Sequence, residues 1–260
     1  MKRRLFLKNS ALIAGGASLA APAMGKSQSA DSGKGLFELR VYTISFGSNG
    51  KNVLEQYFKE ALIPFLNKRN IKLAAFEEYS LEEPTKLYVL LAYPTISDYF
   101  RVQAELSTDT AYIKASLAYS SIPAAKTVYS RYETFLLEAF DKYPSLVVPG
   151  EKKGLFELRI YESASEDAGR RKIAMFDNEE IALFLKVGLL PVFFGKIIAG
   201  QYMPALVYMV GFTDMADRNA TWARFGAHDE WNAMRVKPEY ADTVSNIRKI
   251  FLTPASYSLV

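Results

Sequence analysis

The sequence contains no cysteine and only one histidine, His228. Without thiols the chain has no disulfide, no thiolate nucleophile and no cysteine metal ligand. A single imidazole also excludes a site built from several histidines of one chain. Basic residues number 32 against 28 acidic ones, but four of them (Lys2, Arg3, Arg4 and Lys8) crowd the N-terminus, and 32 − 4 leaves 28 against 28. This balance lacks the basic surface of nucleic-acid-binding proteins, so we expect no nucleic-acid partner.

Two common catalytic motifs are missing as well. The segment Gly47–Gly50 has neither the lysine nor the strand-to-helix spacing of a phosphate-binding loop. No Gly-x-Ser-x-Gly nucleophile elbow occurs. Together with the lone histidine, these absences argue against a catalytic triad and a zinc site of the common types. We therefore expect no bound metal and no obligatory cofactor, with haem kept as an alternative.

The N-terminus has the three regions of a signal peptide. A basic start, Met1–Lys8, is followed by an uncharged stretch and by the small residues Ala21-Pro22-Ala23. The apolar part is shorter than the ~20 residues that span a bilayer. Adjacent Arg3 and Arg4 resemble a twin-arginine signal. The sequence predicts a signal peptide over residues 1–23, a flexible leader over 24–34, and export to the bacterial periplasm with only transient membrane contact.

The mature chain is internally duplicated. Gly35–Tyr42 (GLFELRVY) recurs as Gly154–Tyr161 (GLFELRIY) at an offset of 119, and seven of the eight positions are identical. Tyr88 and Tyr208 lie in a second echo at an offset of 120. An offset that stays nearly constant over half a repeat indicates a duplicated domain. We predict a first repeat over 35–140, a linker over 141–153 and a second repeat over 154–260.

Each repeat shows the same pattern of strands and amphipathic helices. In the first we expect strand 36–43, helix 52–68, strands 73–79 and 87–93, helix 97–119 and strand 127–137. In the second we expect strand 155–161, helix 172–187, strands 191–198 and 205–212, helix 218–234 and strand 245–252. This βαββαβ order is that of the ferredoxin-like unit. Because one sheet face of such a unit lacks helices, we predict an α+β fold in which the two units pack sheet to sheet as an intrachain dimeric α-β barrel.

At this point the sequence resembles a known family. The opening strand, Phe-Glu-Leu-Arg-x-Tyr, resembles that of the NIPSNAP family and is present in both repeats. The stretch from Trp222 to Arg235 resembles the family's second-helix signature, in which Trp-x-x-Phe precedes Glu-Trp and Arg. The first repeat lacks that Trp pair. The resemblance implies the dimeric α-β barrel fold, which small monooxygenases and haem-handling enzymes share, and it implies no particular catalytic residue.

The opening strands supply the candidate site. Alternation puts Phe37, Leu39 and Val41 on one face and Glu38, Arg40 and Tyr42 on the other. The second repeat offers the matching polar set Glu157, Arg159 and Tyr161. We expect the apolar faces to meet the helices and the polar sets to line the barrel interior as ligand-binding residues. The alternative is that each Glu–Arg pair is a structural ion pair.

Two further residues are weaker candidates. His228 has the chemistry of a haem ligand or proton shuttle, but its polar surroundings favour an exposed or helix-capping role. Trp231 lies at helical spacing from core aromatics, so we expect core packing ahead of a cavity wall. The function that we favour is an exported accessory protein that binds a small molecule. A monooxygenase-like enzyme and a structural module with a filled barrel stay as alternatives, and a homo-oligomer of the intrachain pseudo-dimer is compatible with all three.

Overall fold

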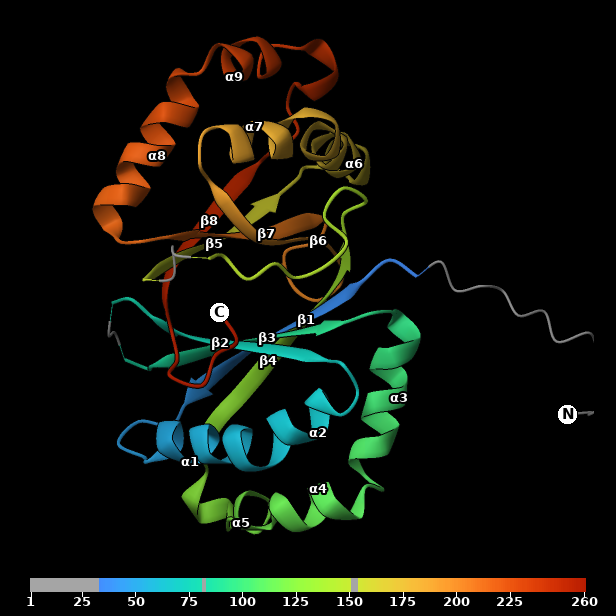
Figure 1. The fold of residues 1–260 in the computed structure, drawn as a ribbon, viewed down its shortest axis with the longest axis vertical. Coiled ribbons are helices and arrows are strands. Elements are labelled where there is room, and N and C mark those ends of the chain that lie inside the picture. The colour runs from blue at the N-terminus through green and yellow to red at the C-terminus, as the bar shows by residue number, and fades with distance from the viewer. Residues whose placement is uncertain (1–32, 81–82, 151–153) are drawn as a thin grey trace, which may run out of the picture. The chain divides into compact units, whose positions relative to one another are not determined.

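The computed structural model describes residues 33–80, 83–150 and 154–260. The predicted signal peptide, with Arg3 and Arg4, and all but the end of the predicted leader lie outside the described residues. Within Ser32–Val260, eight strands close into one antiparallel barrel in the order β1-β3-β2-β8-β5-β7-β6-β4 (Figure 1). None of the described helices combines the length and the apolar character needed to cross a membrane.

The first repeat contains β1 (Leu36–Ile44), α1 (Gly50–Tyr57), η1 (Phe58–Leu62), α2 (Ile63–Asn67), β2 (Lys72–Glu78), β3 (Lys86–Tyr93), α3 (Ile96–Leu106), α4 (Thr110–Ala115), α5 (Leu117–Ser120), η2 (Ala124–Lys126) and β4 (Tyr129–Ala139). The second contains β5 (Leu155–Glu162), α6 (Glu166–Met175), η3 (Phe176–Glu180), α7 (Ile181–Lys186), β6 (Leu190–Ala199), β7 (Ala205–Phe212), α8 (Met215–Ala227), α9 (Asp229–Met234), η4 (Pro238–Tyr240) and β8 (Asn246–Pro254). Here η1 and η3 are single π-helical turns inside continuous helices, and η2 and η4 are 3-10 turns. The predicted βαββαβ order is confirmed in both repeats.

The helix ends differ from the prediction because capping side chains decide them. Ser165 accepts a hydrogen bond from the backbone N–H of Ala168 and starts α6 six residues before the predicted start at 172. Asp109 caps α4 in the same way, so the predicted helix over 97–119 is broken into three. His228 ends α8 and begins α9, which divides the predicted helix over 218–234. The spacing of apolar residues in the sequence does not reveal such interruptions.

The two sheets join edge to edge to close the barrel. β2 pairs with β8 along Phe76–Glu78, and β4 pairs with β6 along Leu136–Ala139. At the second seam a Cβ on Gly195 would come within 2.7 Å of the Leu137 Cβ, so the close approach requires glycine. The predicted intrachain α-β barrel is therefore confirmed, and backbone hydrogen bonds as well as face-to-face packing hold it together.

Each repeat also sends its last segment across to the other. The backbone N–H of Val147, beyond β4, donates to the Val192 carbonyl at 2.9 Å. The N–H of Ala255, beyond β8, donates to the Ala75 carbonyl at 2.9 Å. These crossings cover the seams and bind the repeats into a single folding unit.

Three hydrophobic clusters form the core. The inner one fills the barrel with apolar residues of both repeats, among them Phe37, Leu39, Phe156 and Leu158. The other two lie outside the barrel, between each repeat's strands and its own helices. Figure 1 shows α1–α5 next to the strands of the first repeat and α6–α9 next to those of the second.

One prediction about the sheet faces was wrong. The alternation of the opening strands is as expected, but its two faces are inverted. Phe37, Leu39 and Val41 point into the barrel, and their equivalents Phe156, Leu158 and Ile160 do the same. Glu38, Arg40, Tyr42, Glu157, Arg159 and Tyr161 lie on the helix-covered side. The physical reason is closure: most of the closed barrel interior excludes water, so it takes the apolar face of these strands, while the helix layer supplies polar partners for the charges.

Candidate functional site

A cavity of about 540 Å³ opens at one end of the barrel, and we call it the mouth cavity. Its apolar wall comes from both repeats and comprises Leu39, Val41, Phe135, Leu158, Ile160 and Ile250. Its polar residues are Thr43, Glu78, Lys86, Tyr88, Glu133, Gln201, Tyr202, Arg248 and Lys249. Because the opening strands of both repeats form the wall, neither repeat makes this cavity alone.

The two repeats present different chemistry at the same level of the cavity. Val41 is paired with Tyr88 on one side and with Glu133 on the other. In the second repeat the equivalent Ile160 is paired with Val207 and Arg248. A carboxylate in the first repeat therefore occupies the position that a guanidinium occupies in the second. This difference makes the mouth cavity electrostatically asymmetric.

Hydrogen bonds and a ring contact order the polar side of the cavity. The Tyr88 hydroxyl donates to the Glu78 carboxylate at 3.0 Å. Burial, reinforced by the charge of Glu78, raises the pKa of the Tyr88 phenol, so this group stays protonated and acts as a donor. The Arg248 guanidinium donates to Glu162 at 2.5 Å and lies over the Tyr202 ring, 4.1 Å from its centroid.

Tyr202 itself has a left-handed backbone, with φ of 66°. That conformation costs a residue with a side chain roughly 1–2 kcal/mol. The Tyr202 ring is stacked on the Phe135 ring, with 6.1 Å between the centroids, and the Arg248 guanidinium also lies over the Tyr202 ring. Strained residues that their surroundings hold in place are concentrated at ligand-binding sites. Tyr202 thus forms an aromatic edge to the opening of the mouth cavity.

The mouth cavity combines apolar and polar residues. Its apolar wall can accommodate a hydrocarbon or aromatic body, and its charged residues and phenol can bind a polar group. The described residues contain no cluster of three or more His, Asp or Glu side chains that is arranged to hold a metal ion.

In the first repeat, the Glu38 and Arg40 side chains form hydrogen bonds with each other and with neighbouring side chains beneath the helices. Arg40 donates from Nε and Nη2 to the two Glu38 oxygens at 2.6 and 3.0 Å. Glu38 also accepts from the hydroxyls of Tyr93 and Thr134 at 3.0 and 3.1 Å. Burial raises the pKa of Tyr42 to about 12, although the nearby Arg40 charge opposes this shift. The arrangement is the structural ion pair that the sequence offered as the alternative.

The second repeat has a larger version of the same network. Glu157 is fully buried and accepts from Arg159 at 2.8 Å, from Arg218 at 2.9 and 3.1 Å and from the Trp222 indole at 2.8 Å. Burial alone would raise the pKa of Glu157, but the Arg218 hydrogen bonds and the Arg159 charge outweigh it and lower that pKa. The Tyr161 hydroxyl meets the Tyr208 hydroxyl at 2.9 Å.

Sequence reasoning missed a buried pair in this layer. Lys172 of α6 donates to Glu180 of η3 at 2.7 Å, and both are at most 4% exposed. Burial raises the pKa of Glu180, and the Lys172 charge opposes this only in part. The spacing of eight residues on one helix face was a visible signal, but a lysine and a glutamate at helical positions normally face solvent.

The two weaker candidates have structural roles. The His228 Nδ1 atom accepts a hydrogen bond from the backbone N–H of Glu230 at 3.2 Å, which makes His228 the N-cap of α9. This confirms the capping interpretation and places the chain's sole histidine away from the residues of the mouth cavity. Trp231 packs on Phe225 with ring centroids 4.6 Å apart, so its core role is confirmed.

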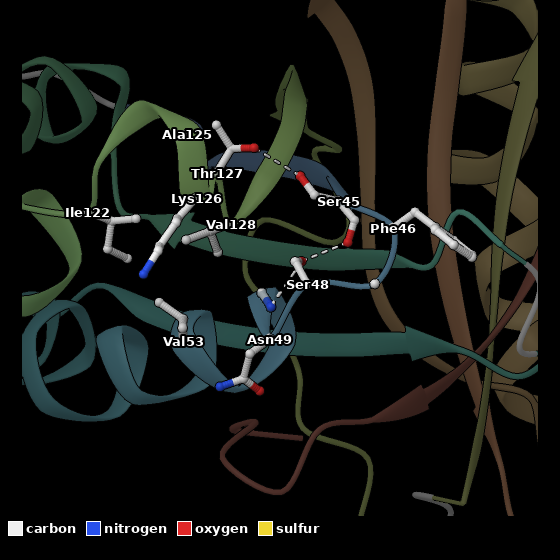
Figure 2. A pocket seen from close by; sticks show the side chains of 12 residues that line it. Ser45, Phe46, Ser48, Asn49, Val53, Ile122, Ala125, Lys126, Thr127 and Val128 are labelled. Atoms are coloured by element: carbon white, nitrogen blue, oxygen red, sulfur yellow. Dashed lines mark hydrogen bonds between the residues drawn. The ribbon is translucent and has the colours of Figure 1, made fainter.

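A second hollow lies on the first repeat alone. It measures about 560 Å³ and lies between the β1–α1 loop and the segment before β4. Figure 2 shows Ser45 bonded to Thr127 and to Ser48 across its wall, with the Lys126 side chain extending toward α1. Phe46, at 83% exposure, forms its outer edge. Because this hollow lacks any contribution from the second repeat, the duplication does not explain it.

Comparison with known proteins finds a family match for the second repeat. The NIPSNAP family profile matches residues 156–259, so the predicted resemblance is confirmed for the second repeat. No curated protein matches the chain. A NIPSNAP-like domain protein from Burkholderia xenovorans is 24% identical over 42% of this chain and 91% of its own, with a TM-score of 0.38.

Two solved structures share the fold over nearly the whole described chain. A candidate monooxygenase from Lactobacillus acidophilus has a TM-score of 0.57 and 8% identity over 85% of this chain and 94% of its own. A candidate monooxygenase from Fusobacterium nucleatum subsp. nucleatum has a TM-score of 0.55 and 9% identity over 86% and 93%. At these identities the likeness establishes the α-β barrel and nothing about the reaction.

Proposed function

We propose that this chain, whose residues 156–259 match the NIPSNAP family profile, is an accessory protein that binds a small amphipathic molecule in the mouth cavity. The observation that supports the proposal is the wall shared by β1 and β5, which makes the cavity a product of the duplication. Most of the barrel interior is packed with apolar side chains, as a structural module would have it. The open end is the exception, and its volume falls within the range of small-molecule sites.

The ligand class follows from the wall and the rim. Aliphatic side chains and Phe135 of the wall can contact an apolar part of the ligand. Glu133 and Arg248 at equivalent levels favour a polar group that can both donate and accept hydrogen bonds. The ligand is therefore an apolar molecule with a hydroxyl, carbonyl or amide end.

Native mass spectrometry of the protein purified from its own host tests this proposal. Thr43 lies in the mouth at the end of β1, so Thr43→Trp fills the opening with a residue that strands tolerate, and Thr43→Ser is the matched control. We expect a retained mass of a few hundred daltons on the wild type and on Thr43→Ser, and an apo mass for Thr43→Trp. A wild type that is always apo, or a ligand that survives in Thr43→Trp, contradicts the proposal.

Export is a separate part of the proposal and is supported by the sequence of residues 1–23 alone. Replacing Arg3 and Arg4 by lysines keeps the charge but removes the twin-arginine pattern. We expect the wild type in the periplasmic fraction and the double variant in the cytoplasm with its signal peptide uncleaved. Cytoplasmic retention of the wild type contradicts export and leaves the ligand proposal intact.

A second candidate function is oxidation of a small molecule by a cofactor-independent enzyme. The shared fold with two candidate monooxygenases is what favours it. The haem-dependent form has less support, because His228 serves as a helix cap. Oxygen-electrode measurements with a small-molecule extract of the host separate the candidates: ligand-dependent oxygen uptake by the pure protein supports the enzyme, and its absence supports the binding protein.

A further inference from the structure

We propose a second binding site, for an apolar molecule that carries one carboxylate, in a pocket beside α6. The pocket measures about 350 Å³ and lies where β4 of the first repeat meets β6 of the second. Its walls include Gly169 and Ile173 of α6, Lys196 of β6, and Met203 and Pro204 of the β6–β7 loop. None of these residues belongs to the mouth cavity.

Comparison of equivalent positions in the two repeats shows why the second repeat has this pocket. The π-helical turn begins at Phe58 in the first repeat and at Phe176 in the second, so helix residues of the two repeats correspond at an offset of 118. Lys51 therefore corresponds to Gly169. In the strands the offset is 119: Glu77 is paired with Leu87, and Lys196 is paired with Leu206. Glu77 therefore corresponds to Lys196.

In the first repeat these two positions close the space between helix and sheet. The Lys51 ammonium of α1 bonds to the Glu77 carboxylate of β2 at 2.6 Å. The second repeat has glycine in place of that lysine and lysine in place of that glutamate. The bridge is thus absent and the space that its side chains would fill is open.

Packing does not require the glycine. A Cβ at Gly169 would lie 3.5 Å from the Ser163 hydroxyl and 3.9 Å from Pro204, both ordinary contacts. A glycine in the interior of a helix costs roughly 0.5–1 kcal/mol relative to alanine. Gly169 thus weakens α6 although packing does not require it. A ligand that occupies the space beside Gly169 would explain the glycine.

The charges around the pocket point to a carboxylate ligand. Lys34 is held by Asp141 at 2.7 Å and lies 3.7 Å from Glu138, and Arg170 is held by Asp167 at 2.5 Å. Lys196 is exposed and lies opposite Glu138 in the register of β4 with β6, but its ammonium forms no ion pair with any residue in the described ranges.

Glu166 is the second acidic residue that lines the pocket. Glu166 lies in the first turn of α6, where the helix dipole stabilises a carboxylate. Among the cations that line the pocket, the ammonium of Lys196 is the one without an ion pair in the described ranges, and we assign the ligand carboxylate to it.

The apolar part of the ligand is set by the remaining walls. Ile173 is half-buried beside Pro204, and Met203 is 51% exposed at the edge of the pocket. An unbranched thioether adapts to apolar ligands of varied shape. A short alkyl chain ending in a carboxylate meets both requirements.

Isothermal titration with octanoate, octanol and octylamine tests the site. We expect octanoate to bind at least tenfold more tightly than octanol, and octylamine to bind least. Lys196→Glu should reverse the preference for octanoate over octylamine. Lys114→Glu on α4 makes the same change of net charge at an exposed position in the first repeat and should leave octanoate binding unchanged.

A transplant of the first repeat's ion pair gives the sharper test. The double variant Gly169→Lys with Lys196→Glu should fill the pocket and abolish octanoate binding, and a cooperative thermal transition checks that it is folded. Octanoate binding that survives in this folded double variant overturns the proposal, as does equal affinity for octanoate and octanol.

The mouth cavity is tested separately with the same probe. In the Thr43→Trp background the mouth is filled, so octanoate binding should persist if it occurs beside α6. Loss of octanoate binding in Thr43→Trp, together with its survival in the α6 double variant, assigns the probe to the mouth and overturns the second site. Neither octanoate result bears on the separate proposal that the mouth cavity retains a ligand from the host.

Discussion

Glu157 of β5 and Trp222 of α8 are joined by a hydrogen bond of 2.8 Å from the indole N–H to the carboxylate. The bond fastens the helix layer of the second repeat to its central strand. The same carboxylate compensates the two guanidinium groups of Arg159 and Arg218. Although the sequence predicts Glu157 as a ligand residue, its contacts make it the anchor of a helix.

Glu157→Gln should therefore destabilise the fold. The substitution keeps the shape but leaves two arginines near a neutral amide in a buried site, and loss of one partner of a buried ion pair costs about 3–5 kcal/mol. Urea denaturation measures this cost. Glu60→Gln, at an exposed position of η1, is the matched control and should behave as wild type. A wild-type midpoint for Glu157→Gln contradicts the anchoring role.

The same residue predicts a pH dependence. The folded-state pKa of Glu157 is lower than its unfolded value, so its contribution to stability is complete above the unfolded pKa, at about 4.3. The contribution is lost as pH falls through the lowered folded value. Wild type and Glu157→Gln should therefore differ most at neutral pH and converge in acid. A difference that grows toward low pH contradicts this sign.

The buried pair of Lys172 and Glu180 should behave as a unit. Lys172→Met alone leaves a buried carboxylate without its cation and should cost roughly 3–5 kcal/mol. The double variant with Glu180→Leu restores an apolar interface like that of the first repeat, where Leu54 and Leu62 are buried, and should recover most of the loss. Chemical denaturation of all four members of the cycle measures the coupling. Additive losses contradict the pairing.

Tyr202 gives a prediction that separates stability from binding. Tyr202→Gly relieves the left-handed backbone, worth roughly 1 kcal/mol, but removes the ring between Phe135 and Arg248. We expect little net change in stability and a clear loss of the ligand retained at the mouth. Asn70→Gly relieves a comparable φ of 58° just before β2, whose other end carries the mouth residue Glu78, and should leave binding unchanged. Equal binding by both variants contradicts the role of Tyr202.

His228 should matter for stability alone. His228→Ala removes the cap of α9, and loss of an N-cap costs about 1 kcal/mol. His228→Asp replaces the capping imidazole nitrogen by a carboxylate oxygen and should restore the stability. Thermal unfolding and ligand retention are measured on the same samples, and loss of ligand in both variants would show that His228 takes part in the site after all.

Much of the fold could be predicted because the duplication is recorded in the residues themselves. The recurrence of Gly35–Tyr42 as Gly154–Tyr161 fixed the repeat, and the β-strand and helix periods fixed the order of elements. The resulting α-β barrel is confirmed by the closed strand order. Among the differences in element bounds, the helix ends depend on single capping side chains such as Ser165.

The site could not be predicted to the same degree because alternation gives two faces without saying which one faces inward. Both faces of β1 are buried: Leu39 is 1% exposed and Glu38 is 3% exposed. The usual rule that charges face solvent therefore gives no answer for this strand. The inward face is decided by the closure of the barrel, which involves β2, β4, β6 and β8 and is not visible in the opening strands. The cavity beside α6 was equally hidden, because it depends on Gly169 and Lys196, which are distant in sequence.

The most direct test of the central claim is methyl NMR of the protein titrated with the small molecule that its host-purified form releases. If the mouth cavity is the binding site, the methyl signals of Leu39 and Val41 in one repeat and of Leu158 and Ile160 in the other shift together, with one common dissociation constant. Shifts confined to one repeat, or to the helix-layer residues around Glu157, would contradict the account.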